Sequence, residues 1–279
     1  MKYALPFPYL EKGELPAKVL RQFSRYGENI AYFYFRIPYL EGRDSSKYGL
    51  IYAEKCKEFL RRAYGSYRCV LDIKLNASRP AINRYYRSNY IANIIREYGF
   101  DGIIARDVGN MAYFVNEFKD LDVYLLTDSA DRRLLDLLYA KAGFSGIIGV
   151  GSKALQEFSI DIRYDRGYIV NEACQDGCEN RLLMYSGRAS LSGFCKECKG
   201  SRFIPYYIKT QDLARFEGSI DTAVISGALK GAAWVEHVLL SYLLGKETKM
   251  EDIINGPQVR GDGNGRSGFF PCLYEDHIP

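Results

Sequence analysis

Four cysteines lie close together in the second half of the chain, with a spacing that is typical of a metal site. They form Cys174-x-x-x-Cys178, then sixteen residues, then Cys195-x-x-Cys198. Thiolates three or four positions apart converge on one centre when the chain between them turns. Four soft thiolates suit either a tetrahedral zinc ion or an iron–sulfur cluster. We therefore predict that these four side chains are metal ligands.

The expected compartment supports metal ligation over disulfide formation. The sequence contains no stretch of about 18 uncharged apolar residues, so we expect no membrane-spanning helix. The first residues lack the apolar core of a secretory signal, which predicts a cytoplasmic protein. In a reducing compartment, clustered cysteines are more often metal ligands than disulfide partners. The other cysteines, Cys56, Cys69 and Cys272, lie apart from the cluster.

Composition and charge exclude several classes of function. The chain has 279 residues, 47% of them hydrophobic, and a formal net charge of +4. Such a mild charge does not indicate a nucleic-acid or anionic-membrane surface. The two histidines, His237 and His277, are too few for histidine-rich metal sites and disfavour a conventional histidine-dependent hydrolase.

The rest of the chain alternates between short β-rich runs and longer helical patterns. Strands are expected at residues 3–5, 30–36, 69–75, 102–106, 123–127, 146–150, 167–171 and 223–226. Helices are expected at residues 14–26, 48–64, 81–98, 108–118, 130–142, 152–157 and 230–244, and a short one begins near Thr210. Eight such repeats in about 250 residues predict an α/β fold of the (β/α)8 barrel type.

The open rival to a barrel is a doubly wound sheet, because strand order cannot be read from pattern. No Gly-x-Gly-x-x-Gly follows the first strand, which disfavours a dinucleotide-binding sheet. We expect the barrel to span residues 1–245, with a cysteine-rich insertion at 171–209 after the seventh strand. Residues 246–279, rich in glycine, are expected to form a loop-rich C-terminal extension.

The position of the cysteines favours iron–sulfur over zinc. They follow the seventh strand and therefore belong to the face where (β/α)8 barrels carry their active sites. A zinc ion that only fastens an insertion has no reason to prefer that face. Zinc remains the alternative metal for this site.

Polar residues at the ends of strands are the candidates for substrate chemistry. Arg36 and Arg106 end two of the predicted strands, and guanidinium groups there can hold a carboxylate or phosphate through two hydrogen bonds. The predicted catalytic set is Arg106, Asp107 and Asp128, with either aspartate as general acid or base. The predicted substrate-binding set is Arg36, Asn76 and Arg181, the last of which lies inside the cysteine segment.

Several segments resemble one known family, the collagenase-like peptidase U family (number thirty-two). Residues 101–109 resemble its "G-x-D-A-I-I-x-x-D-x-G" strand, and residues 125–128 resemble the Thr-containing turn that follows. Residues 170–198 are similar to its cysteine block, and residues 208–213 to its "I-K-x-x-D-L" segment. The resemblance covers about residues 95–230. The family's "H-G-x-x-C" start is replaced here by Asn171-Glu172-Ala173-Cys174.

The resemblance implies a barrel that carries a four-cysteine [4Fe–4S] cluster. Several members act in oxygen-independent hydroxylation of ubiquinone precursors or RNA bases, and others are described as peptidases. It therefore implies an iron–sulfur oxidoreductase that modifies an anionic or aromatic substrate, either a small molecule or an RNA or peptide. The alternatives are a collagenase-like peptidase or hydrolase, and a non-catalytic zinc- or cluster-binding subunit of a homo- or heterodimer. An exposed apolar patch on a helix would favour the subunit.

Overall fold

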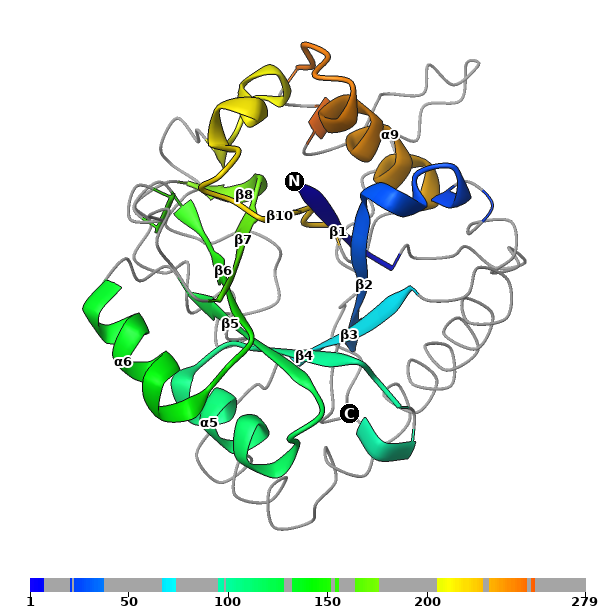
Figure 1. Ribbon diagram of the computed structural model, residues 1–279. Coiled ribbons are helices and arrows are strands. Elements are labelled where there is room, and N and C mark those ends of the chain that lie inside the picture. Colours follow the sequence, from blue (N-terminus) through cyan, green and yellow to red (C-terminus); the bar gives the residue numbers. More distant parts are fainter. Residues whose placement is uncertain are drawn as a thin grey trace, which may run out of the picture.

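Eight parallel strands close into a barrel in the computed structural model of the chain (Figure 1). The structure describes residues 1–7, 21, 23–37, 67–73, 95–97, 99–127, 132–151, 154–155, 164–175, 205–227, 231–249 and 252–253. The barrel strands are β1 (Lys2–Pro6), β2 (Ile30–Ile37), β3 (Arg68–Ile73), β4 (Gly102–Ala105), β5 (Asp122–Thr127), β6 (Gly146–Gly149), β7 (Asp165–Ile169) and β10 (Thr222–Val224). The (β/α)8 prediction is confirmed.

Closure of the sheet rules out the doubly wound alternative. Strand β1 pairs in parallel with β2 on one side and with β10 on the other, so the barrel strands leave no open edge. The strands run around the barrel in the order β1, β10, β7, β6, β5, β4, β3 and β2. All eight therefore end at one rim, where (β/α)8 barrels hold their active sites.

The described helices cover the outside of this sheet (Figure 1). They are α5 (Val108–Glu117), α6 (Arg132–Ala142) and α9 (Ala232–Leu243), with 3-10 turns η1 (Gly27–Asn29) and η3 (Thr210–Phe216). Helix α6 ends before Gly143, whose φ of 72° suits a glycine C-cap and confirms the predicted end. Across the described ranges, no helix is long and apolar enough to cross a membrane.

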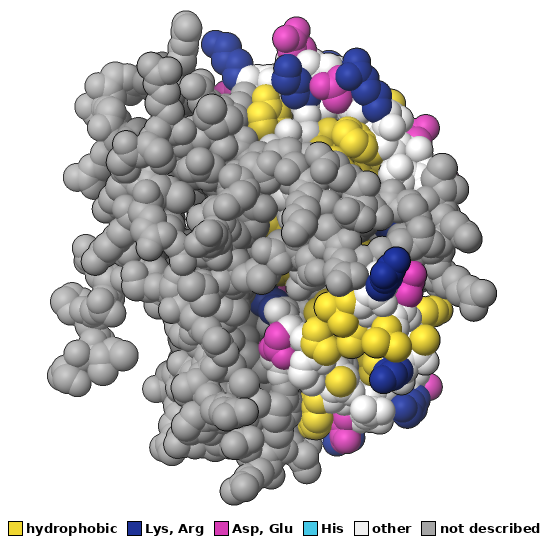
Figure 2. Space-filling model, turned by 90° about the vertical axis from the view of Figure 1, so that its left-hand side faces the viewer, with side chains coloured by type: hydrophobic (Ala, Val, Ile, Leu, Met, Phe, Trp, Pro, Cys, Tyr) yellow, Lys and Arg dark blue, Asp and Glu magenta, His cyan; other side chains and the backbone are white. Residues whose placement is uncertain are grey.

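One helix exposes large apolar side chains to solvent. Leu135 of α6 is buried against the barrel, whereas Leu134 and Leu137 are 44% and 50% exposed. Figure 2 views the molecule from the left-hand side of Figure 1, where α6 lies, and shows hydrophobic side chains on the surface among basic and acidic ones.

A second, two-stranded sheet follows the seventh barrel strand and was not predicted. Strand β8 (Asn171–Gln175) pairs antiparallel with β9 (Pro205–Tyr207). The predicted strand at 167–171 is therefore wrong at its end. Its last register pair with β10 is Ile169 with Val224, the Val170 amide still donates to the Val224 carbonyl, and Asn171 already belongs to β8. The physical reason is that the Val170 carbonyl accepts the Ile208 amide at 2.9 Å, which turns the chain toward β9.

The barrel interior is filled by alternate residues of the strands. One buried cluster contains strand residues, among them Tyr32, Tyr124 and Ile148, together with Val150 just after β6, and it lies along the barrel axis. The Tyr32 and Tyr124 ring centroids are 5.5 Å apart. A second cluster combines the opposite strand faces with helix residues such as Phe114 and Val235. Inside the barrel, large rings therefore need small neighbours.

Gly146 supplies this space beside Tyr124, its register partner on β5. A Cβ atom at Gly146 would lie 2.7 Å from the Asp165 carbonyl oxygen and 3.0 Å from Cδ1 of Tyr124. The nearest atom belongs to the backbone of β7, so it cannot move aside as a flexible side chain would. Gly231 precedes α9, and a Cβ atom there would meet nothing within 4 Å.

We expect Gly146→Ala to lower the free energy of unfolding by about 1–3 kcal/mol, because the methyl group overpacks the barrel interior. Gly231→Ala is the matched control and should change it by less than about 1 kcal/mol. Urea unfolding followed by circular dichroism measures both. Equal stability of the two variants would contradict this account of the packing.

Candidate functional site

A buried ion pair lies at the carboxyl ends of two neighbouring strands. Asp72 is next to last in β3, and Arg106 directly follows β4. Each lies two residues beyond a member of the interior cluster, Val70 or Ile104, so alternation places both on the inner face of the barrel. The side chains of Arg106 and Asp72 are only 5% and 2% exposed.

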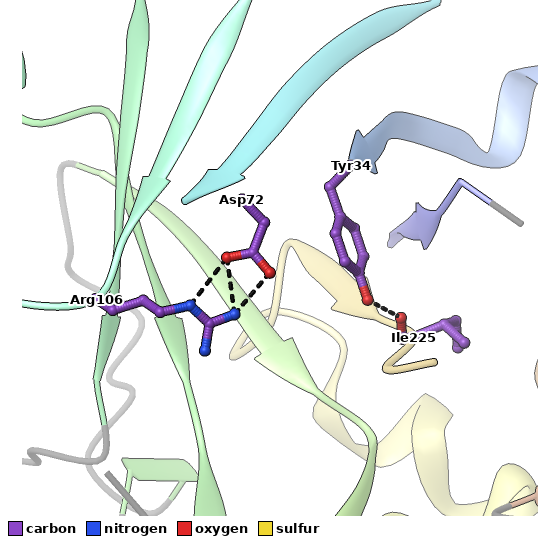
Figure 3. Close-up of polar contacts among 4 residues, drawn as sticks. All are labelled: Tyr34, Asp72, Arg106 and Ile225. Carbon is purple, nitrogen blue, oxygen red and sulfur yellow. Dashed lines mark hydrogen bonds and ion pairs between the residues drawn. The ribbon is translucent and has the colours of Figure 1, made fainter. Parts of the chain in front are cut away.

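The guanidinium group and the carboxylate form a bidentate ion pair (Figure 3). Arg106 donates from Nε to Oδ1 of Asp72 at 3.0 Å, and from Nη2 to Oδ1 at 2.7 Å and Oδ2 at 2.6 Å. Planar guanidinium and carboxylate groups match in this arrangement, which fixes orientation as well as charge. A buried ion pair is weakly stabilising at best, because both ions lose their hydration. The pair lies at the carboxyl-terminal rim of the barrel, the end where (β/α)8 barrels hold their active sites.

On another side of the same rim, a tyrosine ties β2 to the chain after β10. The Tyr34 hydroxyl donates to the carbonyl oxygen of Ile225 at 2.7 Å, and Tyr34 is buried (Figure 3). The Ile225 amide donates in turn to the Ala4 carbonyl at 2.9 Å. These contacts span β1, which lies between β2 and β10, and they fasten the rim where the barrel closes.

Asp107 serves as the N-cap of α5. Its carboxylate accepts the Asn110 backbone amide at 2.8 Å and also contacts the Asn110 side-chain amide. This contact satisfies an amide that the first turn of a helix leaves without an intrahelical partner. The cap gives Asp107 a structural role at the rim, and its catalytic role stays a prediction.

The cysteine segment leaves and rejoins the described structure at one place. Cys174 lies in β8, one residue before Gln175, which pairs with Pro205 of β9. Residues 176–204, which contain the other three cysteines, therefore depart and return at adjacent positions beyond the end of β7. The side chain of Cys174 and the whole of Cys178, Cys195 and Cys198 lie outside the described residues.

The structure tests the remaining predicted residues only in part. The Cα of Arg36 on β2 is in register with that of Asp72, which places the two backbones side by side at the rim. The side chain of Arg36, together with Asn76, Asp128 and Arg181, lies outside the described residues. No group of three or more His, Cys, Asp or Glu side chains within the described ranges could hold a metal ion.

Asp72 is the rim residue that the sequence reasoning missed. A signal was present, because it is a lone carboxylate in the apolar run Cys69-Val70-Leu71-Asp72-Ile73. A charge in a buried strand needs a partner of opposite sign. Arg106 could have been proposed as that partner, since it ends the neighbouring strand.

Neither a protein-family model nor a curated protein matches the chain. Among solved structures, it is similar to the U32 peptidase Mk0906, with 9% identity, a TM-score of 0.48 and coverage of 72% of this chain and 86% of that one. It is also similar to KGPDC from Streptococcus mutans, with 13% identity, a TM-score of 0.42 and coverage of 80% and 85%. N-acetylneuraminate lyase from Fusobacterium nucleatum, complexed with pyruvate, gives 11% identity, a TM-score of 0.44 and coverage of 91% and 76%. At such identities the likeness concerns the barrel fold alone.

We expect Asp72→Asn to destabilise the protein by about 3–5 kcal/mol, because it removes the carboxylate charge that the buried Arg106 guanidinium binds through three hydrogen bonds. Glu117→Gln is the matched control, since it breaks the exposed pair that Glu117 forms with Arg96. Exposed pairs contribute about 0–1 kcal/mol, so the control should stay near the wild type. Equilibrium unfolding in urea measures both, and similar losses would contradict the importance of burial.

Proposed function

We propose that this chain is an iron–sulfur barrel enzyme in which Cys174, Cys178, Cys195 and Cys198 bind a [4Fe–4S] cluster beside the active-site rim. The observation that carries the proposal is the pairing of Gln175 with Pro205. It holds both ends of the cysteine segment together, beyond the end of β7. This arrangement lets ligands from its two halves approach one another without first closing a long loop.

The donor set fits the proposed group. Four thiolates match the ligands of a cubane cluster, and thiolate ligation is favoured in a reducing compartment. When bound, such a cluster supplies electron transfer or a site for polarising a substrate. The same donors also suit zinc, so metal identity is the first property to measure.

The substrate would bind at the rim. Arg106, oriented by Asp72, presents a fixed guanidinium there, and Arg36 lies near the end of β2, in register with Asp72 of the intervening strand β3. We propose that they recognise a carboxylate, phosphate or polar ring edge of the substrate, with Asn76 and Arg181 as further contacts. Asp128 would move protons. The reaction class is a redox modification, with oxygen-independent hydroxylation as the specific candidate.

The metal content tests the proposal. Protein purified without oxygen should be brown and contain about four iron and four sulfide per chain. Cys174→Ser and Cys198→Ser should each abolish the visible absorption, because each removes a ligand. Cys56→Ser is the matched control, since Cys56 lies far from the cluster in sequence, and it should keep the colour. A colourless protein with one zinc per chain would overturn the redox proposal and leave a structural metal site.

A subunit role is the second candidate, and the exposed apolar face of α6 favours it. Leu134 and Leu137 lie one turn apart on this helix and are about half exposed. Arg133 and Lys141, both exposed, lie on the same face at helical spacing. The surface would suit a partner with apolar side chains surrounded by carboxylates.

We expect the double change Leu134→Glu, Leu137→Glu to abolish any assembly larger than the 31.8 kDa chain, because it places charge in the contact. Light scattering after gel filtration measures the mass. The matched control is Leu244→Glu, at an exposed leucine that follows α9. A wild-type protein that stays monomeric at every concentration, alone and in extracts, would remove the subunit candidate.

A further inference from the structure

The root of the β8–β9 ribbon is held from outside by a single buried hydroxyl. We define the ribbon root as Val170, Asn171, Tyr207 and Ile208, where Asn171 pairs with Tyr207. The Tyr242 hydroxyl of α9 lies 3.0 Å from the Val170 carbonyl oxygen and 2.9 Å from that of Ile208. One phenol therefore bridges the residue that precedes β8 and the residue that follows β9, at the base of the ribbon. Tyr242 is 3% exposed.

A side-chain amide holds the ribbon root on its other side. Asn171 is 3% exposed and donates from Nδ2 to the Ser226 carbonyl at 2.8 Å. The Ser226 amide donates back to Oδ1 of Asn171 at 2.6 Å. This pair of hydrogen bonds imitates a backbone ladder and ties the first residue of β8 to the chain that follows β10. The ribbon root is thus fastened both to a helix and to the barrel.

Burying the Tyr242 hydroxyl and the Asn171 side-chain amide costs desolvation free energy, which their hydrogen bonds at the ribbon root must offset. Burial is the main cause that raises the pKa of Tyr242, so the phenol keeps its proton and acts as a donor. A phenylalanine would fill the same volume without burying a hydroxyl. The hydroxyl therefore serves its two carbonyl partners, which lie at the ribbon root.

We propose that Tyr242 and Asn171 are positioning residues for the cysteine site, and that they act by immobilising the ribbon root. Cys174 lies three residues beyond Asn171, about 10 Å along an extended strand. If the root moves, that ligand and the returning chain at Pro205 move with it. Bringing thiolates together costs conformational entropy, and a root fixed in advance lowers this cost. The inference rests on the proposed metal site and deepens it.

The test compares two buried tyrosines whose hydroxyls contact backbone carbonyl oxygens. Tyr242→Phe removes the hydroxyl at the ribbon root. Tyr34→Phe is the matched control, because Tyr34 is also buried and also donates to a backbone carbonyl, that of Ile225. We expect the metal to leave Tyr242→Phe about tenfold faster than the wild type when the anaerobically purified proteins are mixed with a chelator. Tyr34→Phe should change the release rate by less than twofold.

A second variant and a second measurement guard against general destabilisation. Asn171→Asp keeps the acceptor for the Ser226 amide and loses the donor, so release should accelerate severalfold. In metal-free protein, amide hydrogen exchange at residues 171–175 and 205–208 should rise in Tyr242→Phe and stay unchanged in Tyr34→Phe.

The possible outcomes separate the two proposals. A wild-type protein that holds no metal overturns the proposed function, and this inference with it. A metal-bound wild type whose Tyr242→Phe variant releases metal no faster than Tyr34→Phe overturns the positioning role alone. Exchange that rises evenly over the barrel would also overturn it, because the hydroxyl would then support the fold in general.

Discussion

The pairing of β1 with both β2 and β10 is the constraint on which the rest of the structure depends. Backbone amides and carbonyls on a sheet edge need partners, and closure supplies them to all eight strands. A closed parallel barrel also gathers every strand end at one rim. The Asp72–Arg106 pair, the Tyr34–Ile225 contact and the start of β8 all lie at this rim because the chain cannot place a strand end elsewhere.

Closure in turn dictates what fills the barrel. The interior is filled by alternate side chains of strands whose spacing is fixed by the closed sheet. A large ring on one strand therefore limits the size of the side chain at the register position on the next strand. Tyr124 faces its register partner Gly146, and Gly102 and Gly167 also lie where an added Cβ would meet backbone oxygen. The short runs Gly-Ile-Ile-Ala and Gly-Ile-Ile-Gly are therefore both a strand signal and a packing device.

The barrel could be predicted from the sequence because its signals are local. Apolar runs such as residues 102–105 and 146–149 and the glycine after α6 each mark an element within a few residues. The β8–β9 ribbon could not be predicted, because Pro205–Tyr207 is only three residues long and its partner lies about thirty residues away. Tyr242 was missed for the same reason, since nothing local distinguishes it from the other 23 tyrosines. The cysteine ligands are predicted from spacing, the expected compartment and the family resemblance, and three of the four lie wholly outside the described residues.

The Asp72 partner changes what Arg106 can contribute to recognition. A solitary guanidinium at the rim would attract any anion through its charge, which is the role that its position after β4 suggested. With Asp72 bound through Nε and Nη2, the pair carries no net charge, so an arriving anion gains little long-range attraction. In the proposed role, the pair would instead contribute a guanidinium plane whose orientation is already fixed in a buried site, with little rotamer entropy left to lose. In the role proposed for Arg106, such a group would select a substrate by the geometry of its acceptors rather than by its charge. An aromatic ring with polar edge atoms would satisfy that demand as well as a carboxylate would.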